Sequence, residues 1–397
     1  MNWPSVRMGK FFCVKHGYAF KGEYFDSEGP YVLLTPGNFD EQGGFRDQGE
    51  KTKFYTGDVP DGYVLDEDDL LVAMTEQAPG LLGSSAWIPE GGRFLHNQRI
   101  GRVVDLDEDH LGKRFLYYVF NTREVRQQIS ATATGGKVRH TAPERIGKVV
   151  FRLPPLDTQH RIAEGLSSYD DLIENNRRRM ALLEDAAREL YREWFVHLRF
   201  PGYEHTRISN GVPEGWEKKT LGDLALITMG QSPQSQHYNE DGEGLPFHQG
   251  VTGFGERFVT HRIYSTALNR IAEAGDILCS VRAPVGRLNV TLDKIVIGRG
   301  LSALRSKTGH QSLLLQQLRG HFFKEDMIGG GAIFASVTKK EFSAQELLDP
   351  PERLKRALEE VTVPCDEQLR VLHLQNQQLR AARDLLLPRL MSGEVTV

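Results

Sequence analysis

Two long segments of the chain carry apolar residues at alternating steps of four and three positions, the heptad spacing of helices that pack along one another. In the first segment these positions are Ile162, Leu166, Tyr169, Ile173, Asn176, Met180, Leu183, Ala187, Leu190 and Trp194. Adding 196 to each number gives a second seam, which runs from Leu358 to Leu390 and is again mostly apolar. A helix that lies on a globular core drifts toward a period of about 3.6, so this spacing near 3.5 predicts two helices sharing one seam.

Pro364 and two asparagines shape the expected helical pair. Pro364 lies inside the second segment, so we expect a broken or kinked helix, with a short helix before a longer one. We expect an antiparallel pair in which Asn176 faces Asn376, because a buried amide pair would penalise slips of a heptad. In that register the facing pairs are Met180 with Leu372, Leu183 with Leu369, Ile173 with Leu379, Ile162 with Leu390 and Tyr169 with Arg383. In the alternative interpretation, both asparagines lie at the edge of the seam and bind water.

The stretches before the two seams have a different pattern. Short β-like runs bounded by Gly- and Asp-rich loops occur at 31–34, 103–104, 148–151 and 294–297, and helical patterns at 115–120 and 313–318. Each stretch therefore predicts a compact α/β globule, and the fold class is α+β. The expected organisation is a globule at 1–156, a helix at 157–199, a linker at 200–213, a second globule at 214–351 and a second helix at 352–397.

The chain also repeats itself once. Trp216, Gly222 and Gly230 each follow Trp3, Gly9 and Gly17 by 213 residues. Further on, Asp276-Ile277-Leu278 matches Asp69-Leu70-Leu71, and each is followed by a Gly/Pro segment that begins at Ala283-Pro284 or Ala78-Pro79. Glycine pairs recur at Gly135-Gly136 and Gly330-Gly331, and double prolines at Pro154-Pro155 and Pro350-Pro351. The common order of these features predicts an internal pseudo-two-fold repeat.

Composition narrows the class of protein less than the pattern does. The 397 residues, 39% hydrophobic and 26% charged, are ordinary for two or three folded domains. No apolar run approaches the roughly 20 residues that span a bilayer, and we expect a cytoplasmic protein. The three cysteines are far apart, so neither a disulfide framework nor a zinc site is indicated. The formal net charge of −4 does not exclude DNA, because a local group of Lys and Arg can act within a neutral whole.

Motifs that would indicate catalysis are missing. Gly135-Gly136-Lys137-Val138 lacks the upstream glycine and the hydroxyl residue of a phosphate-binding loop. Asp349-Pro350-Pro351-Glu352 resembles the Asp-Pro-Pro turn of amino-methyltransferases, but Glu352 stands where those enzymes stack an aromatic on the flipped base. No strand leads into a glycine-rich loop for an adenosyl cofactor. We therefore expect no catalytic residues and no metal site in this chain, and interpret the double prolines as helix entrances.

The chain as a whole resembles the specificity (S) subunit of type I restriction-modification enzymes. The residues that carry this resemblance are 153–162 (Leu-Pro-Pro-Leu-Asp-Thr-Gln-His-Arg-Ile), 190–195, 275–278, 283–286, Ile297-Gly298-Arg299-Gly300-Leu301 and 387–394. The second helix entrance, 349–353, departs from the family pattern because it lacks the usual Pro-Pro-Leu and the glutamine. This departure puts the exact start of the second helix in doubt.

The resemblance implies that the globules are target-recognition domains, each reading one half of a bipartite DNA sequence. The two helices would form an antiparallel coiled coil between them. Two methyltransferase subunits would bring S-adenosylmethionine and adenine methylation, and restriction subunits would bring ATP and Mg. The chain itself would be a non-catalytic DNA-recognition subunit of a system that defends against foreign DNA.

Base reading needs Arg and Lys for guanine and Asn and Gln for adenine, and phosphate contacts are more common than base contacts. The candidate DNA-binding residues are Gln77, Arg93, Arg99, Lys137 and Arg139 in the first globule and Arg282, Arg287, Arg299, Lys339 and Lys340 in the second. Lys137 with Arg139 and Lys339 with Lys340 are the strongest, because each pair follows a glycine pair. Two other classes stay open: a self-contained DNA methyltransferase or nuclease with its own recognition domain, and a coiled-coil scaffold that binds only proteins.

Overall fold

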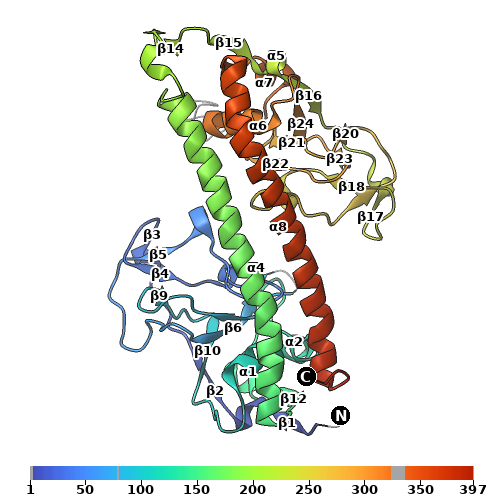
Figure 1. The fold of residues 1–397 in the computed structure, drawn as a ribbon. Helices are drawn as coiled ribbons and strands as arrows, with labels where there is room; N and C mark the ends of the chain where they lie inside the picture. Colours follow the sequence, from blue (N-terminus) through green and yellow to red (C-terminus); the bar gives the residue numbers. More distant parts are fainter. Residues whose placement is uncertain (1–2, 78–79, 323–335, 397) are drawn as a thin grey trace. The chain divides into compact units, whose positions relative to one another are not determined.

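The computed structural model describes residues 3–77, 80–322 and 336–396, which form two compact units. Unit 1 takes in the described residues up to Glu174 and those from Asn376 onward, and unit 2 is Asn175–Gln375. Each unit holds one globule and part of the two long helices α4 (Leu156–Tyr191) and α8 (Glu352–Ser392), as Figure 1 shows. Both helices begin directly after a double proline, as predicted. The repeat positions Ala78-Pro79 and Gly330-Gly331 lie outside the described residues.

The same four-stranded antiparallel sheet occurs in both units. In unit 1 its order is β2 (Cys13–His16), β10 (Ile100–Val104), β6 (Leu70–Ala73) and β8 (Ser85–Trp87). In unit 2 the order is β16 (Ala225–Met229), β24 (Leu301–Ser306), β21 (Ile277–Ser280) and β22 (Leu288–Val290). The repeat seen in the sequence is therefore a repeat of topology.

A second sheet is also shared, and it contains one parallel pair in each unit. In unit 1 its order is β3 (Phe25–Asp26), β5 (Phe54–Tyr55), β4 (Tyr31–Leu33) and β9 (Phe94–Leu95), with β4 parallel to β9. In unit 2 it is β17 (Tyr238–Asn239), β19 (Tyr264–Ser265), β18 (Leu245–His248), β23 (Ile295–Ile297) and β20 (Ile271–Ala272), with β18 parallel to β23.

The remaining elements complete each globule. Two-stranded pairs join β1 (Ser5–Arg7) to β12 (Val150–Arg152), β7 (Thr75–Glu76) to β11 (Arg139–His140), β13 (Ile208–Ser209) to β14 (Val212–Pro213) and β15 (Glu217–Thr220) to β25 (Glu346–Asp349). The short helices are α1 (Lys113–Phe120), α2 (Arg123–Ala131), α3 (Pro143–Ile146), α5 (Leu221–Leu224), α6 (Gln311–Phe322) and α7 (Lys339–Ser343). The predicted strands and the two predicted short helices all coincide with observed elements.

The repeated aspartates have the same role in both units. Asp69 is buried, pairs with Arg102 Nε (2.9 Å) and accepts the N–H of Asp66 (2.9 Å). Asp276 is buried, pairs with Arg305 Nε (2.7 Å) and accepts the N–H of Glu273 (2.9 Å). A buried carboxylate needs such partners, and this requirement explains why Asp recurs before β6 and β21.

The long helices pack antiparallel in unit 1. Ile162 and Leu166 of α4 share a buried core with Leu390 of α8. Further along α4, Asp170 Oδ1 pairs with Arg383 Nη1 (2.6 Å), and the carbonyl of Ile173 accepts from Asn376 Nδ2 (3.3 Å). Because rising numbers on α4 meet falling numbers on α8, the two helices run in opposite directions here.

The expected register is partly tested by these contacts. Ile162 shares a core with Leu390 in unit 1, and Met180 and Leu183 pack with Leu369 and Leu372 in unit 2, as that register requires. Arg383 was expected opposite Tyr169 and is paired with the adjacent Asp170. Asn176 and Asn376 are both buried but belong to different units, so their pairing stays a prediction.

The predicted break at Pro364 is wrong, because α8 runs without interruption from Glu352 to Ser392, and the alternative of a kink within this continuous helix stays a prediction. Pro364 removes the hydrogen bond to the carbonyl of Glu360. Both residues are exposed, so water can reach that side of the helix. The buried side is held on either side of the proline by Leu358 and Leu369, which pack in the core. Tertiary contact thus overrides the local preference against helix.

Candidate nucleic-acid interface

In unit 2 the backbone brings the candidate residues to one end of the antiparallel sheet, where β21 ends. The N–H of Val281 donates to Gly300 O (2.9 Å), and that of Ser280 to Arg287 O (2.9 Å). The N–H of Val337 donates in turn to Val281 O (2.9 Å), which places the start of α7 beside the same loop. The residues carried by these adjoining segments are Arg282, Arg287, Arg299, Lys339 and Lys340, and all five are exposed.

The side chains of four of these residues are free to meet a ligand. Arg282, Arg299, Lys339 and Lys340 have no side-chain hydrogen bond or ion pair within residues 3–77, 80–322 and 336–396. The turn that leads into α7 is fixed, because Thr338 and Glu341 form a capping box. The backbone that carries the lysines is therefore ordered while their ammonium groups face solvent.

In unit 1 the candidates gather around the pair of β7 and β11. Gln77 directly follows β7, and Lys137 lies two residues before β11. Arg99 lies beside them, because its carbonyl accepts the N–H of Met74 (3.1 Å), the residue that precedes β7. Arg93 is apart from this group, at the start of β9 in the other sheet, where it pairs with Glu90 (2.7 Å).

Arg139 is held inside unit 1 by a buried carboxylate. Glu76 is only 3% exposed, and its Oε2 accepts the N–H groups of Gly80, Leu81 and Leu82 (2.9–3.1 Å). Its Oε1 pairs with Arg139 Nη1 (3.1 Å), and Arg139 Nη2 donates to Ser130 O (2.5 Å). Arg139 thus fixes the loop that carries Gln77, while Lys137 is exposed in the neighbouring turn.

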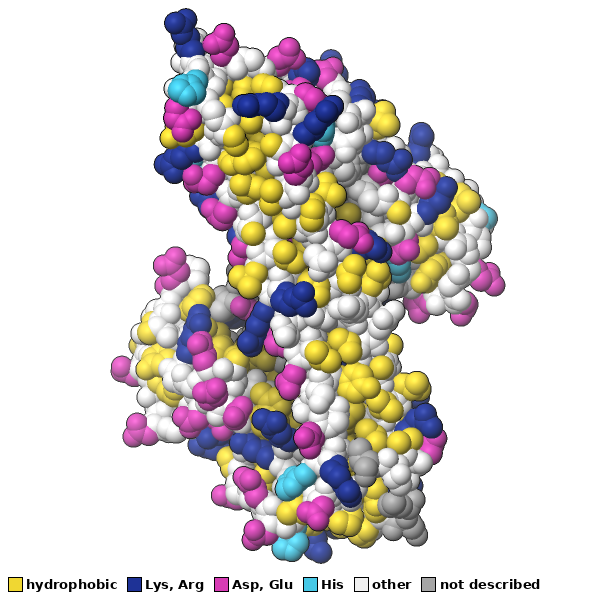
Figure 2. Space-filling model, viewed as in Figure 1, with side chains coloured by type: hydrophobic (Ala, Val, Ile, Leu, Met, Phe, Trp, Pro, Cys, Tyr) yellow, Lys and Arg dark blue, Asp and Glu magenta, His cyan; other side chains and the backbone are white. Residues whose placement is uncertain are grey.

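The basic side chains of both units occur in small groups between acidic side chains. On the face drawn in Figure 2, Lys and Arg side chains lie interspersed with Asp and Glu side chains. This distribution agrees with the formal net charge of −4. Any attraction for a polyanion must therefore come from small groups of side chains such as those at the ends of the sheets.

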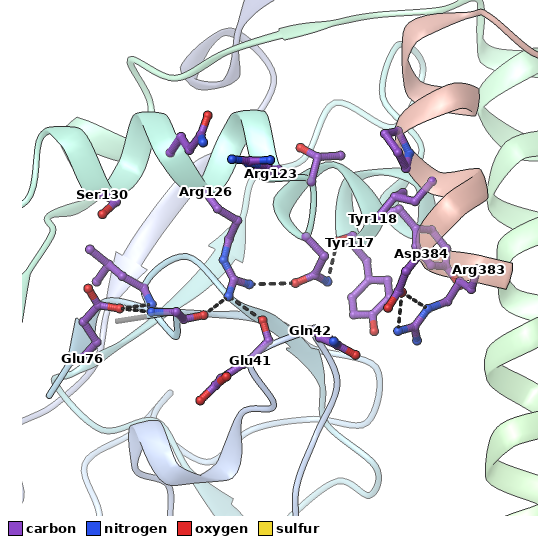
Figure 3. Close-up of a pocket in the computed structure, with 17 residues that line it drawn as sticks. Glu41, Gln42, Glu76, Tyr117, Tyr118, Arg123, Arg126, Ser130, Arg383 and Asp384 are labelled. Carbon is purple, nitrogen blue, oxygen red and sulfur yellow. Dashed lines mark hydrogen bonds and ion pairs between the residues drawn. The ribbon is translucent and has the colours of Figure 1, made fainter. Parts of the chain in front are cut away.

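A pocket of about 690 Å³ lies in unit 1, between α2, the loops at 41–42 and 76–82, and the last turns of α8 (Figure 3). Two half-buried guanidinium groups that line it, those of Arg126 and Arg383, are already engaged. Arg126 donates to the carbonyls of Glu41 and Gly80 and to Asn121 Oδ1, and burial lowers the pKa of Arg126 to about 10. Arg383 pairs with Asp170 and Asp384. These two guanidinium groups are therefore engaged within unit 1, whereas Arg123, which also lines the pocket, is exposed.

The Asp349-Pro350-Pro351-Glu352 turn is structural. Asp349 pairs with both Lys219 (2.6 Å) and Lys355 (2.5 Å), and Glu352 is the first residue of α8. Within the described residues, no group of three or more His, Cys, Asp or Glu side chains is arranged to hold a metal ion. No described helix combines the length and the apolar character needed to cross a membrane.

Sequence reasoning missed a polar chain in unit 2 that involves three residues. His248 Nε2 lies 2.9 Å from His261 Nδ1, and His261 Nε2 lies 3.0 Å from Asp293 Oδ2. Burial lowers the pKa of His248 to about 4. The three residues are far apart in the sequence, so no spacing signal could have joined them. They hold β18 just before the exposed Gln249.

Comparison with known proteins gives one consistent result. A family model described as a type I restriction modification DNA specificity domain matches residues 1–185. A Methanocaldococcus jannaschii chain named for the MjaX type I restriction enzyme specificity subunit is 31% identical over 250 residues, which are 62% of this chain and 59% of that one. The MjaIX specificity subunit of the same organism is 23% identical and aligns over 76% of this chain and 73% of its own.

A solved structure shows the same fold. It is the crystal structure of a type I restriction-modification S subunit from M. genitalium, with a TM-score of 0.56 and 17% identity. The match covers 98% of this chain and 96% of that chain.

Proposed function

We propose that the chain is a type I restriction-modification DNA specificity subunit that reads a two-part DNA sequence, one half with each globule, and its similarity to such subunits supports this proposal. The observation that carries this proposal is the repeated sheet with basic or amide side chains at the same end in both units. These are the β6 end in unit 1 and the β21 end in unit 2. Two copies of one scaffold with different exposed residues suit two different half-sites.

We propose that the exposed candidates contact DNA directly, by phosphate or base contacts. These residues are Gln77, Arg99 and Lys137 in unit 1 and Arg282, Arg287, Arg299, Lys339 and Lys340 in unit 2. Arg139 acts through the loop that it fixes with Glu76, and Arg93, engaged by Glu90, makes at most a peripheral phosphate contact. Because the total charge is negative, binding depends on these few groups and falls steeply with salt.

The proposed partners follow from the family. Two methyltransferase subunits would dock on the globules and helices and bring S-adenosylmethionine, and restriction subunits would bring ATP and Mg. The domains expected from the sequence, 1–156 and 214–351 for recognition with 157–199 and 352–397 as spacers, remain our proposal for the functional division of the chain.

The test is methylation mapping in cells with and without this gene. We expect one recurring two-part motif that carries methyladenine and disappears with the gene. The Lys137→Ala variant, which leaves the Arg139–Glu76 ion pair intact, should weaken one half of the motif only.

Other results would overturn the proposal. Methylation of DNA by the purified chain alone would make it a self-contained enzyme. A lack of sequence-specific duplex binding, even with the methyltransferase subunit present, would make it a protein scaffold.

A further inference from the structure

One tight turn occupies the same place in both units. In unit 1 it connects β9 to β10, and the N–H of Ile100 donates to Asn97 O (3.0 Å). In unit 2 it connects β23 to β24, and the N–H of Leu301 donates to Gly298 O (3.0 Å). The residue just after the first turn position is Gln98 in unit 1 and Arg299 in unit 2.

In both units a glycine of a neighbouring segment packs closely against the backbone of the turn. A Cβ atom on Gly17 would lie 2.0 Å from Asn97 O, and one on Gly230 would lie 2.1 Å from Gly298 O. No side chain fits at such a distance, so the chain needs glycine at both places. These two glycines belong to the repeat recognised in the sequence. Their shared role shows that the two turns are equivalent.

The contacts of each turn extend to the end of the parallel strand pair. In unit 1, Asn97 Nδ2 donates to Leu34 O (2.9 Å), next to the end of β4. In unit 2, the N–H of Gly298 donates to His248 O (2.8 Å) at the end of β18. The position of each turn is thus set by contacts on two sides, one of which is made in unit 1 by the side chain of Asn97.

The side chains at the tips are uncommitted. Gln98 and Arg299 are both exposed, and neither side chain has a hydrogen bond or ion pair with any part of the chain that the structure describes. Both turns adjoin the groups of candidate DNA-binding residues, because Gly300 O accepts from Val281 and Arg99 O accepts from Met74. Because the backbone of the turn is already fixed, only the side chain at its tip loses conformational entropy when it binds.

We propose that this turn is a base-reading position in both half-sites, with Gln98 reading adenine and Arg299 reading guanine. The assignment rests on the function proposed above and names a specificity-determining residue in each half. Glutamine matches the N6 and N7 groups of adenine in the major groove, and arginine matches the O6 and N7 groups of guanine. Exchange of the tip residue should change one base of one half-site and leave the other half intact.

The experiment uses the complex of the full chain with its methyltransferase subunits and a duplex library that is randomised in both half-sites. Methylated sequences are read for the wild type and for Arg299→Gln, Arg299→Lys, Arg299→Ala and Gln98→Arg. We expect Arg299→Gln to lose a preference for guanine of roughly ten- to hundred-fold at one position of one half-site. Gln98→Arg should alter one adenine position in the other half-site.

Arg161→Gln and Arg188→Gln are matched controls, because both residues are exposed on α4, away from the sheets, and both should keep the complete motif. Thermal unfolding midpoints of the tip variants should equal that of the wild type. Arg299→Lys should keep at least part of the preference for guanine, because lysine also matches the O6 and N7 groups of guanine. An unchanged motif in both Arg299→Gln and Arg299→Ala would show that Arg299 reads no base and would overturn the proposal, and the proposed function would stand. If the wild-type complex yields no two-part motif, the proposed function itself fails.

Discussion

The two units attach their long helices at the same repeat position, but with different chemistry. In unit 1, buried Gln159 donates to the carbonyls of His110 and Pro154 and accepts the N–H of Gly112, each at 2.9 Å. The residue 196 positions later is Lys355, whose ammonium pairs with Asp349, which in turn pairs with Lys219. A neutral amide network in one unit is thus a charged network in the other. The start of α8 lacks the glutamine that is usual in the specificity subunits that this chain resembles. The ion pairs of Asp349 with Lys355 and Lys219 stand in its place.

The same contrast recurs one stretch further along the helices. Asp170 on α4 accepts from the Tyr118 hydroxyl (2.6 Å) of its own globule and also pairs with Arg383. Asp366, its counterpart on α8, pairs with Arg257, which also contacts Glu184. Burial raises the pKa of Tyr118, so its hydroxyl stays a donor. The two units therefore share the position on the long helix that contacts the globule, but the residue of the globule that this position contacts differs.

The largest expected effect comes from breaking the charged attachment. Arg257→Ala should destabilise unit 2 by about 3–5 kcal/mol, because the variant leaves Asp366 and Glu184 close to each other with only Arg319 as a partner. The matched change in unit 1, Tyr118→Phe, should cost about 1 kcal/mol, since Asp170 keeps Arg383. Hydrogen exchange resolved by unit measures both. Equal losses would show that the two attachments are energetically equivalent.

The helix entrance should respond next. Gln159→Ala leaves one N–H and two carbonyls without their partner and should destabilise unit 1 by about 2–3 kcal/mol. The control is Thr158→Ala, because Thr158 is adjacent to Gln159 but more exposed than it. This variant should change the unfolding free energy by less than about 0.5 kcal/mol. Denaturant titration gives the two values, and a small loss for Gln159→Ala would mean that water replaces the amide.

The smallest expected effect is common to both units and depends on pH. Burial lowers the pKa of His96 in unit 1 and of His248 in unit 2 to about 4, below the ordinary value of about 6.5. The unfolded chain therefore binds more protons than the folded one between these values, and stability falls as the pH drops from 6.5 toward 4. Each histidine should contribute a loss of at most about 2 kcal/mol between pH 7 and pH 5. Denaturant unfolding at pH 7 and pH 5 measures this loss as a difference in unfolding free energy. The His96→Gln and His248→Gln variants should show a smaller change in unfolding free energy between the two pH values.

Features set by local spacing could be predicted from the sequence, whereas features set by tertiary contact could not. The double prolines mark both helix starts, and the heptad steps identify the buried faces of α4 and α8. Pro364 was misjudged because the packing on the opposite side of α8 lies outside any local rule. Arg139 was expected to be free, but its partner Glu76 is far away in the chain and becomes adjacent only through the pairing of β7 and β11.

The candidate site shows the same limit. The five candidates of the second unit were expected in loops. Lys339 and Lys340 instead begin α7, and the structure brings their segment and those of Arg282, Arg287 and Arg299 together at the end of β21. Gln98 was not among the candidates, and neither offset recognised in the repeat, 213 or 196, connects Gln98 with Arg299. Their equivalence depends on the insertions between the repeat landmarks, and only the hydrogen-bonded turns make it visible.

The glycine that packs against each turn has a consequence for how such a chain changes over generations. Since the side chains of Gln98 and Arg299 are exposed and have no hydrogen bond or ion pair within the described residues, exchanging either one should cost little folding free energy. Glutamine codons become arginine codons by substitution of a single nucleotide. If the turn reads a base as we propose, the substitution of one nucleotide in this codon can alter which base is preferred while the protein still folds. The glycines, in contrast, tolerate no such step, because any side chain there collides with the backbone of the turn.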